Sequence, residues 1–261
     1  MQIQTHRRLI QSVLTLKQAE TYRPIQEYES KQLAVDWLNS PEKFYEHTRR
    51  YAGFLIMQVV YCRRFPTSGS KEAMEIYECN EHFASVGPGS YILDTFPALA
   101  KLPGFGTVWG SWKKIGDEMF KFDSSVFLKL YRGMKKELEE KTGYPCFAGG
   151  LELSVPECHG LSELESAYMA AGLVQPGSES TAALLNWLVR CLVTWPELQQ
   201  QAHEELDRVV GSDRTPRWED EPDLPFIRVM VKELLRIAPG SKFGVPHCAS
   251  QDDWYLMSLP N

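Results

Sequence analysis

A polar patch, Gln175 to Thr181, interrupts an apolar stretch of this 261-residue chain. Within the patch, Glu179 and Ser180 place a carboxylate next to a hydroxyl, and these groups are the parts of a proton relay. Pro176 lacks a backbone N–H, so a helix that runs through it is expected to kink and to leave the carbonyl of Gly172 free. The patch therefore predicts acid–base chemistry. A Pro-kinked core helix whose Glu and Ser bond to neighbouring elements explains the same residues without chemistry.

The stretch that carries this patch, residues 161–196, is predicted to be one long helix. After its first turn it contains only two charged residues, Glu179 and Arg190. A helix that is apolar on nearly every side is expected to be buried on nearly every side. Ser162 and Glu165 have the spacing of a capping box, which starts the helix. The polar patch leaves two halves shorter than the roughly 20 apolar residues of a membrane span, so we expect a core helix.

One face of this predicted helix is lined mainly by small residues. Offsets of four, seven, eight and eleven positions are close to multiples of 3.6, so five residues share that face. They are Gly172, Pro176, Glu179, Ser180 and Ala183. Such a face would let a large flat ligand lie against the helix backbone, beside the acid and the hydroxyl.

A second pair of charges, Glu233 and Arg236, lies on a later predicted helix, residues 226–237. Helical spacing places both on one stripe with Phe226 and Val229, and a stripe that begins apolar is expected to face the core. Charges on such a stripe are rarely left unpaired, so a structural ion pair is predicted. The alternative is an exposed i, i+3 pair that contributes only about 0.2 to 0.5 kcal/mol.

Composition limits the classes of function. The formal net charge of −6 and the pI near 5.6 argue against a nucleic-acid partner, because such proteins concentrate Lys and Arg on one face. The six cysteines form no CxxC pair, so no metal site and no disulfide framework is predicted. Residues 1–20 lack the apolar segment of a signal peptide.

The rest of the chain is also predicted to be mostly helical. Apolar spacing, caps and breaking residues predict helices at residues 3–19, 25–37, from Ser40-Pro41 to Val59, 71–84, 108–141 and 197–210. Residues 143–160 are predicted to be irregular, and residues 240–261 contain strand-like pieces. Residues 86–106 form a mobile lid, a membrane-contacting loop or an ordinary loop packed on the core.

Four motifs in the second half of the chain resemble the cytochrome P-450 family, in particular its fungal haem-thiolate monooxygenases. They read G-S-E-S-T, W-P-E-L-Q-x-x-A-H-E-E-L-D-R-V-V-G, D-L-P-F-I-R-V-M-V-K-E-L-L-R-I-A-P and G-V-P-H-C-A-S-Q-D-D-W-Y. The resemblance is continuous from Leu161 to Tyr255 and continues more weakly upstream. It implies a single partial domain over residues 1–261, mainly α with little β structure, from about the family's C helix to just past its K helix.

The resemblance also implies catalytic roles on the central helix, which corresponds to the oxygen-binding I helix. Gly177, Glu179, Ser180 and Thr181 match the motif A-G-x-D/E-T-T/S, in which the alcohol after the acid hydrogen-bonds dioxygen and helps to deliver protons. Ser180 replaces the usual threonine, and Pro176 the usual alanine. A serine hydroxyl lacks the methyl group that stiffens the threonine rotamer, so a looser relay is expected.

The same resemblance assigns further residues to haem binding and to the fold. Glu233 and Arg236 match the ExxR pair of the K helix. Arg7 matches an arginine that pairs with a haem propionate, and His247 falls where another propionate partner is often found. Gly177 belongs to the motif that lies against the cofactor.

The family's haem-ligating cysteine, in F-x-x-G-x-R-x-C-x-G, is not found in this sequence, and Cys248 lies in a different context. The expected function is oxidation of a lipophilic small molecule by haem, O2 and electrons from NADPH-cytochrome P-450 reductase, at the cytosolic face of the endoplasmic reticulum membrane in the intact family. The sequence shows no membrane anchor, so this chain is expected to be a truncated, cytoplasmic form of the family. It is also expected to bind haem poorly, because the ligating cysteine is not found in it. The alternative is a catalytically inactive helical protein or interaction module.

Overall fold

The computed structural model describes residues 2–65, 67, 69–87, 91–102, 112–140, 146–153 and 161–240. Within these ranges all regular elements are helices and no strand occurs, which confirms the mainly α fold class. In chain order they are α1 (Gln2–Val13), α2 (Leu16–Thr21), α3 (Arg23–Asn39), η1 (Pro41–Lys43), α4 (Phe44–Tyr61), α5 (Lys71–Ser85), α6 (Ile92–Thr95), η2 (Pro97–Lys101), α8 (Trp112–Glu139), α9 (Phe147–Leu153), α10 (Glu163–Thr194), α11 (Pro196–Val209), η3 (Trp218–Asp223) and α12 (Pro225–Ile237).

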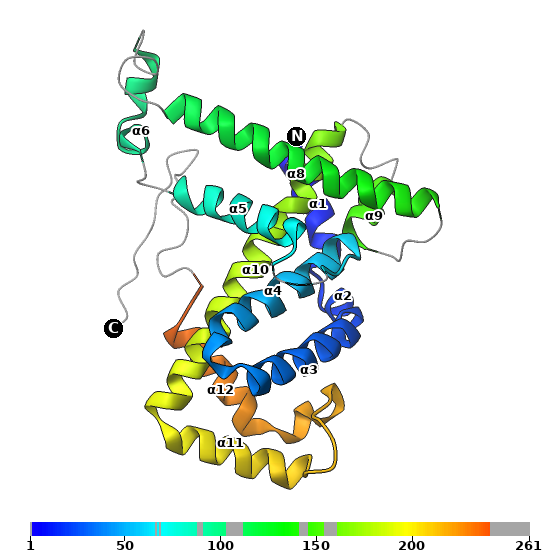
Figure 1. Ribbon diagram of the computed structural model, residues 1–261, viewed down its shortest axis with the longest axis vertical. Coiled ribbons are helices and arrows are strands. Elements are labelled where there is room, and N and C mark those ends of the chain that lie inside the picture. Colours follow the sequence, from blue (N-terminus) through cyan, green and yellow to red (C-terminus); the bar gives the residue numbers. More distant parts are fainter. Residues whose placement is uncertain are drawn as a thin grey trace, which may run out of the picture.

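Helix α10 is the long central helix that the sequence predicts. It crosses the molecule from the region of α8 and α9 to α11 (Figure 1). The predicted capping box is present, because the Ser162 hydroxyl accepts the Glu165 N–H at 3.2 Å and the Glu165 carboxylate accepts the Ser162 N–H at 2.7 Å. The helix continues through Pro176 for a total of 32 residues. Among the helices of the described residues, none is both long enough and apolar enough to cross a membrane.

The core lies where α10 meets α4, α5, α8 and α9. The most extensive contact between two helices joins α4 and α10. The fully buried side chains of this core include Phe54, Met57, Val60, Tyr61, Cys79, Tyr131, Met134, Ala167, Ala170 and Val174. A Cβ added to Gly177 would lie 2.6 Å from Cγ1 of Ile56, so the missing side chain at this position allows α4 and α10 to approach closely.

A buried carboxylate joins α3 to α4. Glu29 is 0% exposed, and its two oxygens accept hydrogen bonds from Arg50 at 2.9 Å, Gln58 at 2.9 Å and Arg64 at 2.6 Å. Arg50 also pairs with Asp36 at 2.6 Å. The hydrogen bond that Arg64 donates to Glu29 raises the pKa of the Arg64 guanidinium. A buried charge is tolerated only when it is paired in this way.

Three predictions about the elements are corrected. The region 143–160, predicted to be irregular, contains α9, whose Phe147 and Leu151 are buried in the core. The predicted helix 3–19 is divided in two, because Thr15 caps a new helix by accepting the N–H of Gln18. Residues 86–106 contain the short helices α6 and η2. The strand-like pieces at 241–261 lie outside the described residues.

The carboxylate of Glu205 fixes the start of α12. Glu205 lies on α11, is 8% exposed, and accepts the backbone N–H groups of Phe226 and Ile227 at 3.0 Å each. The first N–H groups of a helix have no partner within the helix, and Pro225 at its first position has no N–H to satisfy. A negative charge here also interacts favourably with the helix dipole.

Replacing Glu205 by alanine is expected to lower the free energy of unfolding by about 1 to 2 kcal/mol, the usual cost of losing a helix cap. Urea unfolding followed by circular dichroism measures the change. Glu204→Ala is the matched control, because Glu204 is exposed and bonds only to Gln200 within α11. Equal stability losses for the two variants would contradict the capping role.

Candidate functional site

Glu179 is held at the edge of α10 by residues from two other helices. Its Oε1 atom accepts hydrogen bonds from Arg49 of α4 at 3.1 Å and from Asn80 of α5 at 3.4 Å. The Glu179 side chain is 48% exposed, so it contacts solvent while it is paired. The guanidinium of Arg49 also lies over the Tyr77 ring, 4.7 Å from its centroid. A carboxylate that is oriented and also open to water can exchange protons with bulk solvent.

The two hydroxyls after this acid differ in environment. Ser180 is exposed, and its hydroxyl donates to the carbonyl oxygen of Pro176 at 2.7 Å. Such a bond to the carbonyl four residues earlier is common for Ser within helices. Thr181 is half-buried. Glu179 and Ser180 are therefore neighbours on the helix surface, with the serine hydrogen directed to the backbone in this state.

The small-residue face of α10 is open. All five of its residues, Gly172, Pro176, Glu179, Ser180 and Ala183, are exposed. The expectation that this helix is buried on nearly every side is thus wrong for this face. A Cβ added to Gly172 would meet no atom within 4 Å, and one added to Gly240 would lie 3.8 Å from Cβ of Ser180. The face is therefore open at Gly172, while Gly240 lies near Ser180.

Behind that face, a network of polar side chains holds the helical turn from Gln175 to Ser178 in place. This network was not predicted from the sequence. Asn80, which is 6% exposed, donates to the Ser178 hydroxyl at 2.9 Å. Ser178 donates to the carbonyl of Gln175 at 3.0 Å, and the Gln175 amide donates to the carbonyl of Cys79 at 3.2 Å. Asn80 is almost one hundred positions away from Ser178, and nothing in the local sequence signals their pairing.

The remaining predicted site residues are dispersed. Arg7 is exposed on α1, and His247 lies outside the described residues. Gly177 is turned toward Ile56 of α4. As a cofactor residue, Gly177 stays a prediction.

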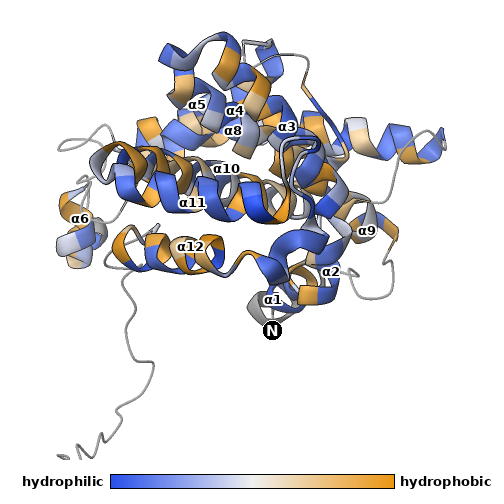
Figure 2. Ribbon diagram, turned by 90° about the horizontal axis from the view of Figure 1, so that it is seen from below, coloured by the Kyte–Doolittle hydropathy of each residue, from blue (hydrophilic) through white to orange (hydrophobic). Residues whose placement is uncertain are grey.

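The ion pair between Glu233 and Arg236 forms on α12, with Arg236 Nε 2.8 Å from the carboxylate. This hydrogen bond holds the pKa of Glu233 below its usual range and raises that of Arg236. The prediction that their stripe faces the core is wrong, since both side chains are exposed and Val229 is 61% exposed. The buried residue of α12 is Leu234. Figure 2 shows this amphipathic helix beside α11.

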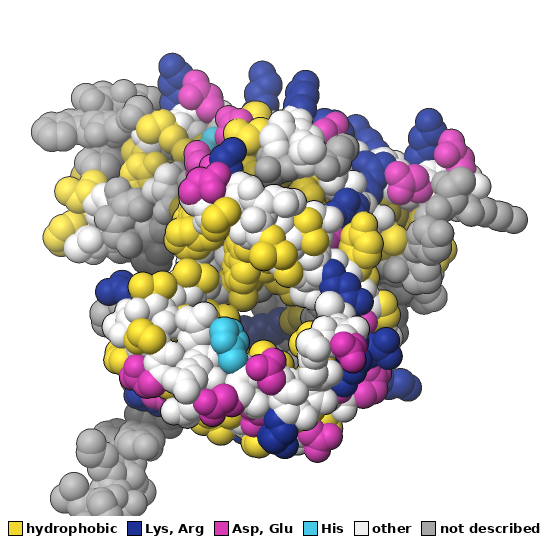
Figure 3. Space-filling view, turned by 60° about the horizontal axis from the view of Figure 1, so that its bottom comes forward, with side chains coloured by type: hydrophobic (Ala, Val, Ile, Leu, Met, Phe, Trp, Pro, Cys, Tyr) yellow, Lys and Arg dark blue, Asp and Glu magenta, His cyan; other side chains and the backbone are white. Residues whose placement is uncertain are grey.

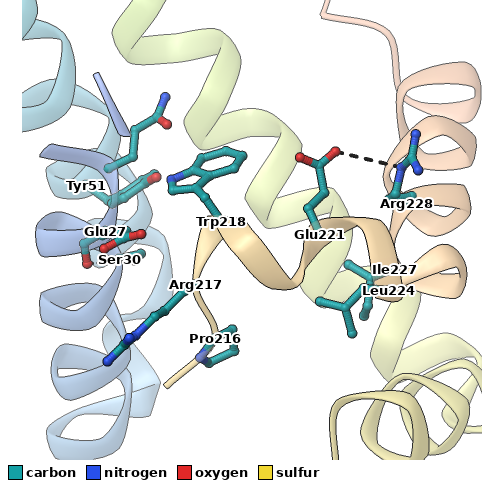
Figure 4. A pocket seen from close by; sticks show the side chains of 11 residues that line it. Glu27, Ser30, Tyr51, Pro216, Arg217, Trp218, Glu221, Leu224, Ile227 and Arg228 are labelled. Carbon is teal, nitrogen blue, oxygen red and sulfur yellow. Dashed lines mark hydrogen bonds and ion pairs between the residues drawn. The ribbon is translucent and has the colours of Figure 1, made fainter. Parts of the chain in front are cut away.

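Two pockets border the long helices. The first lies between α4 and α10 and encloses about 370 Å³. The second encloses about 240 Å³ between α3, α4, η3 and α12. In Figure 4, Trp218 of η3 points toward Tyr51 of α4. Figure 3 shows that the underside of the molecule is hollowed, with hydrophobic side chains gathered above the hollow.

Comparison with known proteins identifies the family. The family description "Cytochrome P450" matches residues 2–254. The chain is 35% identical over 255 residues to the cytochrome P450 monooxygenase verL of Clonostachys rogersoniana, covering 96% of this chain and 46% of that protein. It is 34% identical over 252 residues to virE of Hypocrea virens and 32% identical over 259 residues to fogE of Aspergillus ruber, both named cytochrome P450 monooxygenases.

The virE match covers 96% of this chain and 45% of virE, and the fogE match 98% and 47%. The chain thus spans slightly less than half the length of these fungal relatives. The family match extends over nearly all of the chain and includes both α10 and α12. The chain belongs to the cytochrome P450 family.

Proposed function

We propose that this chain forms the oxygen-side half of a haem monooxygenase that oxidises a lipophilic small molecule. The electrons would come from NADPH-cytochrome P450 reductase, and O2 would supply the inserted oxygen atom. The observation that supports this proposal is the open face of α10, which presents Ser180 and carries Glu179, already oriented by Arg49, at its edge.

The described residues fit one side of a haem. Gly172, Pro176, Ser180 and Ala183 are exposed on one face of α10, where the haem would lie. We assign Arg7, which is exposed on α1, and His247 to its propionates. Bound haem supplies the iron centre at which oxygen is activated.

The described cysteines do not suit the role of haem ligand. Cys79 and Cys191 are buried, and Cys62 and Cys146 are half-buried. Burial raises the pKa of the Cys79 and Cys146 thiols, which disfavours the thiolate that a haem ligand requires.

In this proposal Glu179 and Ser180 carry protons toward the open face. Glu179 takes a proton from solvent at its exposed edge while Arg49 and Asn80 keep its carboxylate in place. The Ser180 hydroxyl would then turn from the Pro176 carbonyl, release its proton toward the ligand face and receive the proton carried by Glu179, which returns Glu179 to the carboxylate form. Serine turns more freely than threonine because it lacks the second substituent on Cβ, so its hydroxyl is less often in position to deliver a proton. Part of the reduced oxygen is therefore expected to leave as hydrogen peroxide.

A chimeric enzyme tests this function. Residues 2–254 would replace the matching segment of verL, and the chimera would be assayed with reductase and NADPH. We expect a reduced, carbon-monoxide-bound spectrum of the thiolate type. Ser180→Ala should keep that spectrum while the ratio of peroxide released to product formed rises about a hundredfold, the smaller end of typical general acid–base effects.

A second experiment places a large side chain on the open face of α10. Gly172→Phe should lower haem content, whereas Gly116→Phe should not, because a Cβ at either glycine meets no atom within 4 Å and only Gly172 lies on α10. If Gly172→Phe left the haem content unchanged and Ser180→Ala left the peroxide release unchanged in a chimera with native circular dichroism, the proposed roles would be refuted.

A further inference from the structure

The pocket between α4 and α10 is lined by two positively charged side chains and one negatively charged side chain. Its charged residues are Arg49, Glu179 and Arg190. Arg49 is paired with Glu179. Arg190 has no hydrogen bond or ion pair from its guanidinium to any residue in the described ranges, and instead lies over the Trp187 ring, 4.7 Å from its centroid. A guanidinium that lies over an aromatic ring can still offer N–H groups to a planar oxyanion.

The uncharged walls of the pocket suit an apolar body. Trp187 and Tyr45 present aromatic rings, and Ala182 and Ala183 leave space because their side chains are single methyl groups. Asn186 is already engaged, since its side-chain oxygen accepts the Thr48 hydroxyl at 2.9 Å. A volume of about 370 Å³ is in the range of small-molecule sites, which are mostly apolar with a few polar groups that fix orientation.

We propose that this pocket binds a small aromatic carboxylate. The carboxylate pairs with the free edge of Arg190, and the ring lies against Trp187, Ala182 and Ala183. This site adjoins the proposed haem face, because Glu179 and Ala183 border both, whereas Arg190 and Trp187 belong to the pocket alone. Binding requires only the chain described here.

The bound carboxylate is coupled to Glu179. Both negative charges lie in one pocket, and both are attracted to Arg49, so each weakens the other's interaction with that arginine. Coupling between two ligands of one group is reciprocal. A carboxylate in the pocket therefore loosens Glu179 from Arg49, and removal of the Glu179 charge tightens carboxylate binding.

The second pocket provides a matched comparison. It also contains two arginines and two aromatic residues, but Arg217 and Arg228 are balanced by Glu27 and Glu221. Figure 4 shows Glu221 paired with Arg228, at 3.7 Å. With no excess positive charge, this pocket is not expected to select an anion.

Calorimetric titration of the purified chain with benzoate tests the proposal, with neutral benzamide as the uncharged analogue. Benzoate should bind saturably, and benzamide should bind roughly tenfold more weakly, because it cannot form the charge-assisted hydrogen bond to Arg190. Arg190→Gln should weaken benzoate binding by a similar factor. Glu179→Gln should strengthen it several-fold, and Arg217→Gln should leave it unchanged.

Arg190 is exposed, so Arg190→Gln is expected to fold, and its circular dichroism and melting temperature verify this. Absence of saturable benzoate binding to the folded wild-type chain would overturn the proposal. Equal affinities of wild-type and Arg190→Gln protein would do the same. A loss of affinity in Arg217→Gln alone would place the ligand in the other pocket and also refute it. Weaker binding in Glu179→Gln would contradict the coupling.

Discussion

Replacing Glu29 by glutamine is expected to lower the free energy of unfolding by about 3 to 5 kcal/mol, the usual cost of breaking a buried ion pair by changing one partner. Glu29 is 0% exposed and accepts hydrogen bonds from two arginines and one glutamine. Glutamine has the same shape, but its NH2 group would face donors. Arg50, which is 8% exposed, would keep only Asp36 as an acidic partner.

Urea unfolding followed by circular dichroism measures this loss. Glu233→Gln serves as the control, because Glu233 is exposed and paired only with Arg236, and surface ion pairs contribute about 0 to 1 kcal/mol. If Glu29→Gln unfolds at the wild-type urea concentration, the network does not stabilise the contact between α3 and α4.

A side chain at Gly177 is expected to separate α4 from α10. Gly177→Ala should lower the free energy of unfolding by about 1 to 3 kcal/mol, the usual cost of overpacking. Its Cβ would lie 2.6 Å from Cγ1 and 2.8 Å from Cδ1 of Ile56. Alanine is the better helix former by about 1 kcal/mol, so a net loss of stability would measure the steric conflict.

Two companion variants make this test specific. Gly172→Ala lies in the same helix, and its Cβ meets no atom within 4 Å, so it should raise stability by roughly 0.5 to 1 kcal/mol. Adding Ile56→Ala to Gly177→Ala removes the clashing atoms and should cost less than the sum of the two single changes. Additive losses in the double variant would show that the two positions do not interact.

The elements with complete local signals were predictable from sequence. The start of α10 follows from the Ser162 and Glu165 capping box, and its length follows from the absence of charges after the first turn. The capping interaction is local, because two residues three positions apart determine it. Helix α9 was missed because its seven residues include two glycines, and its stability comes from burying Phe147 and Leu151 in the core rather than from helix propensity.

The site was predictable only in part, for a similar reason. The order of Glu179 and Ser180 along α10 is a local property, and the family motif contains it. Their partners Arg49 and Asn80 come from helices more than ninety positions away, and periodicity within one segment says nothing about such pairs.

The orientation of α12 was mispredicted because two apolar stripes compete on it. Val229 belongs to the stripe with Glu233 and Arg236, whereas Leu234, on another side, is the residue that packs inward. Only contact with α10 and α11 decides between these stripes.

The cap that Glu205 places on α12 has a consequence for the connection between α11 and α12. The first residue of α12 is set by a side chain of the preceding helix, and not by the length of the intervening chain. Residues 211–217 are exposed throughout, and Gly211 turns the backbone out of α11 with a φ of 73°. This connection can therefore accept inserted residues without shifting the register of α12, which makes it a natural position for a tag or a length change.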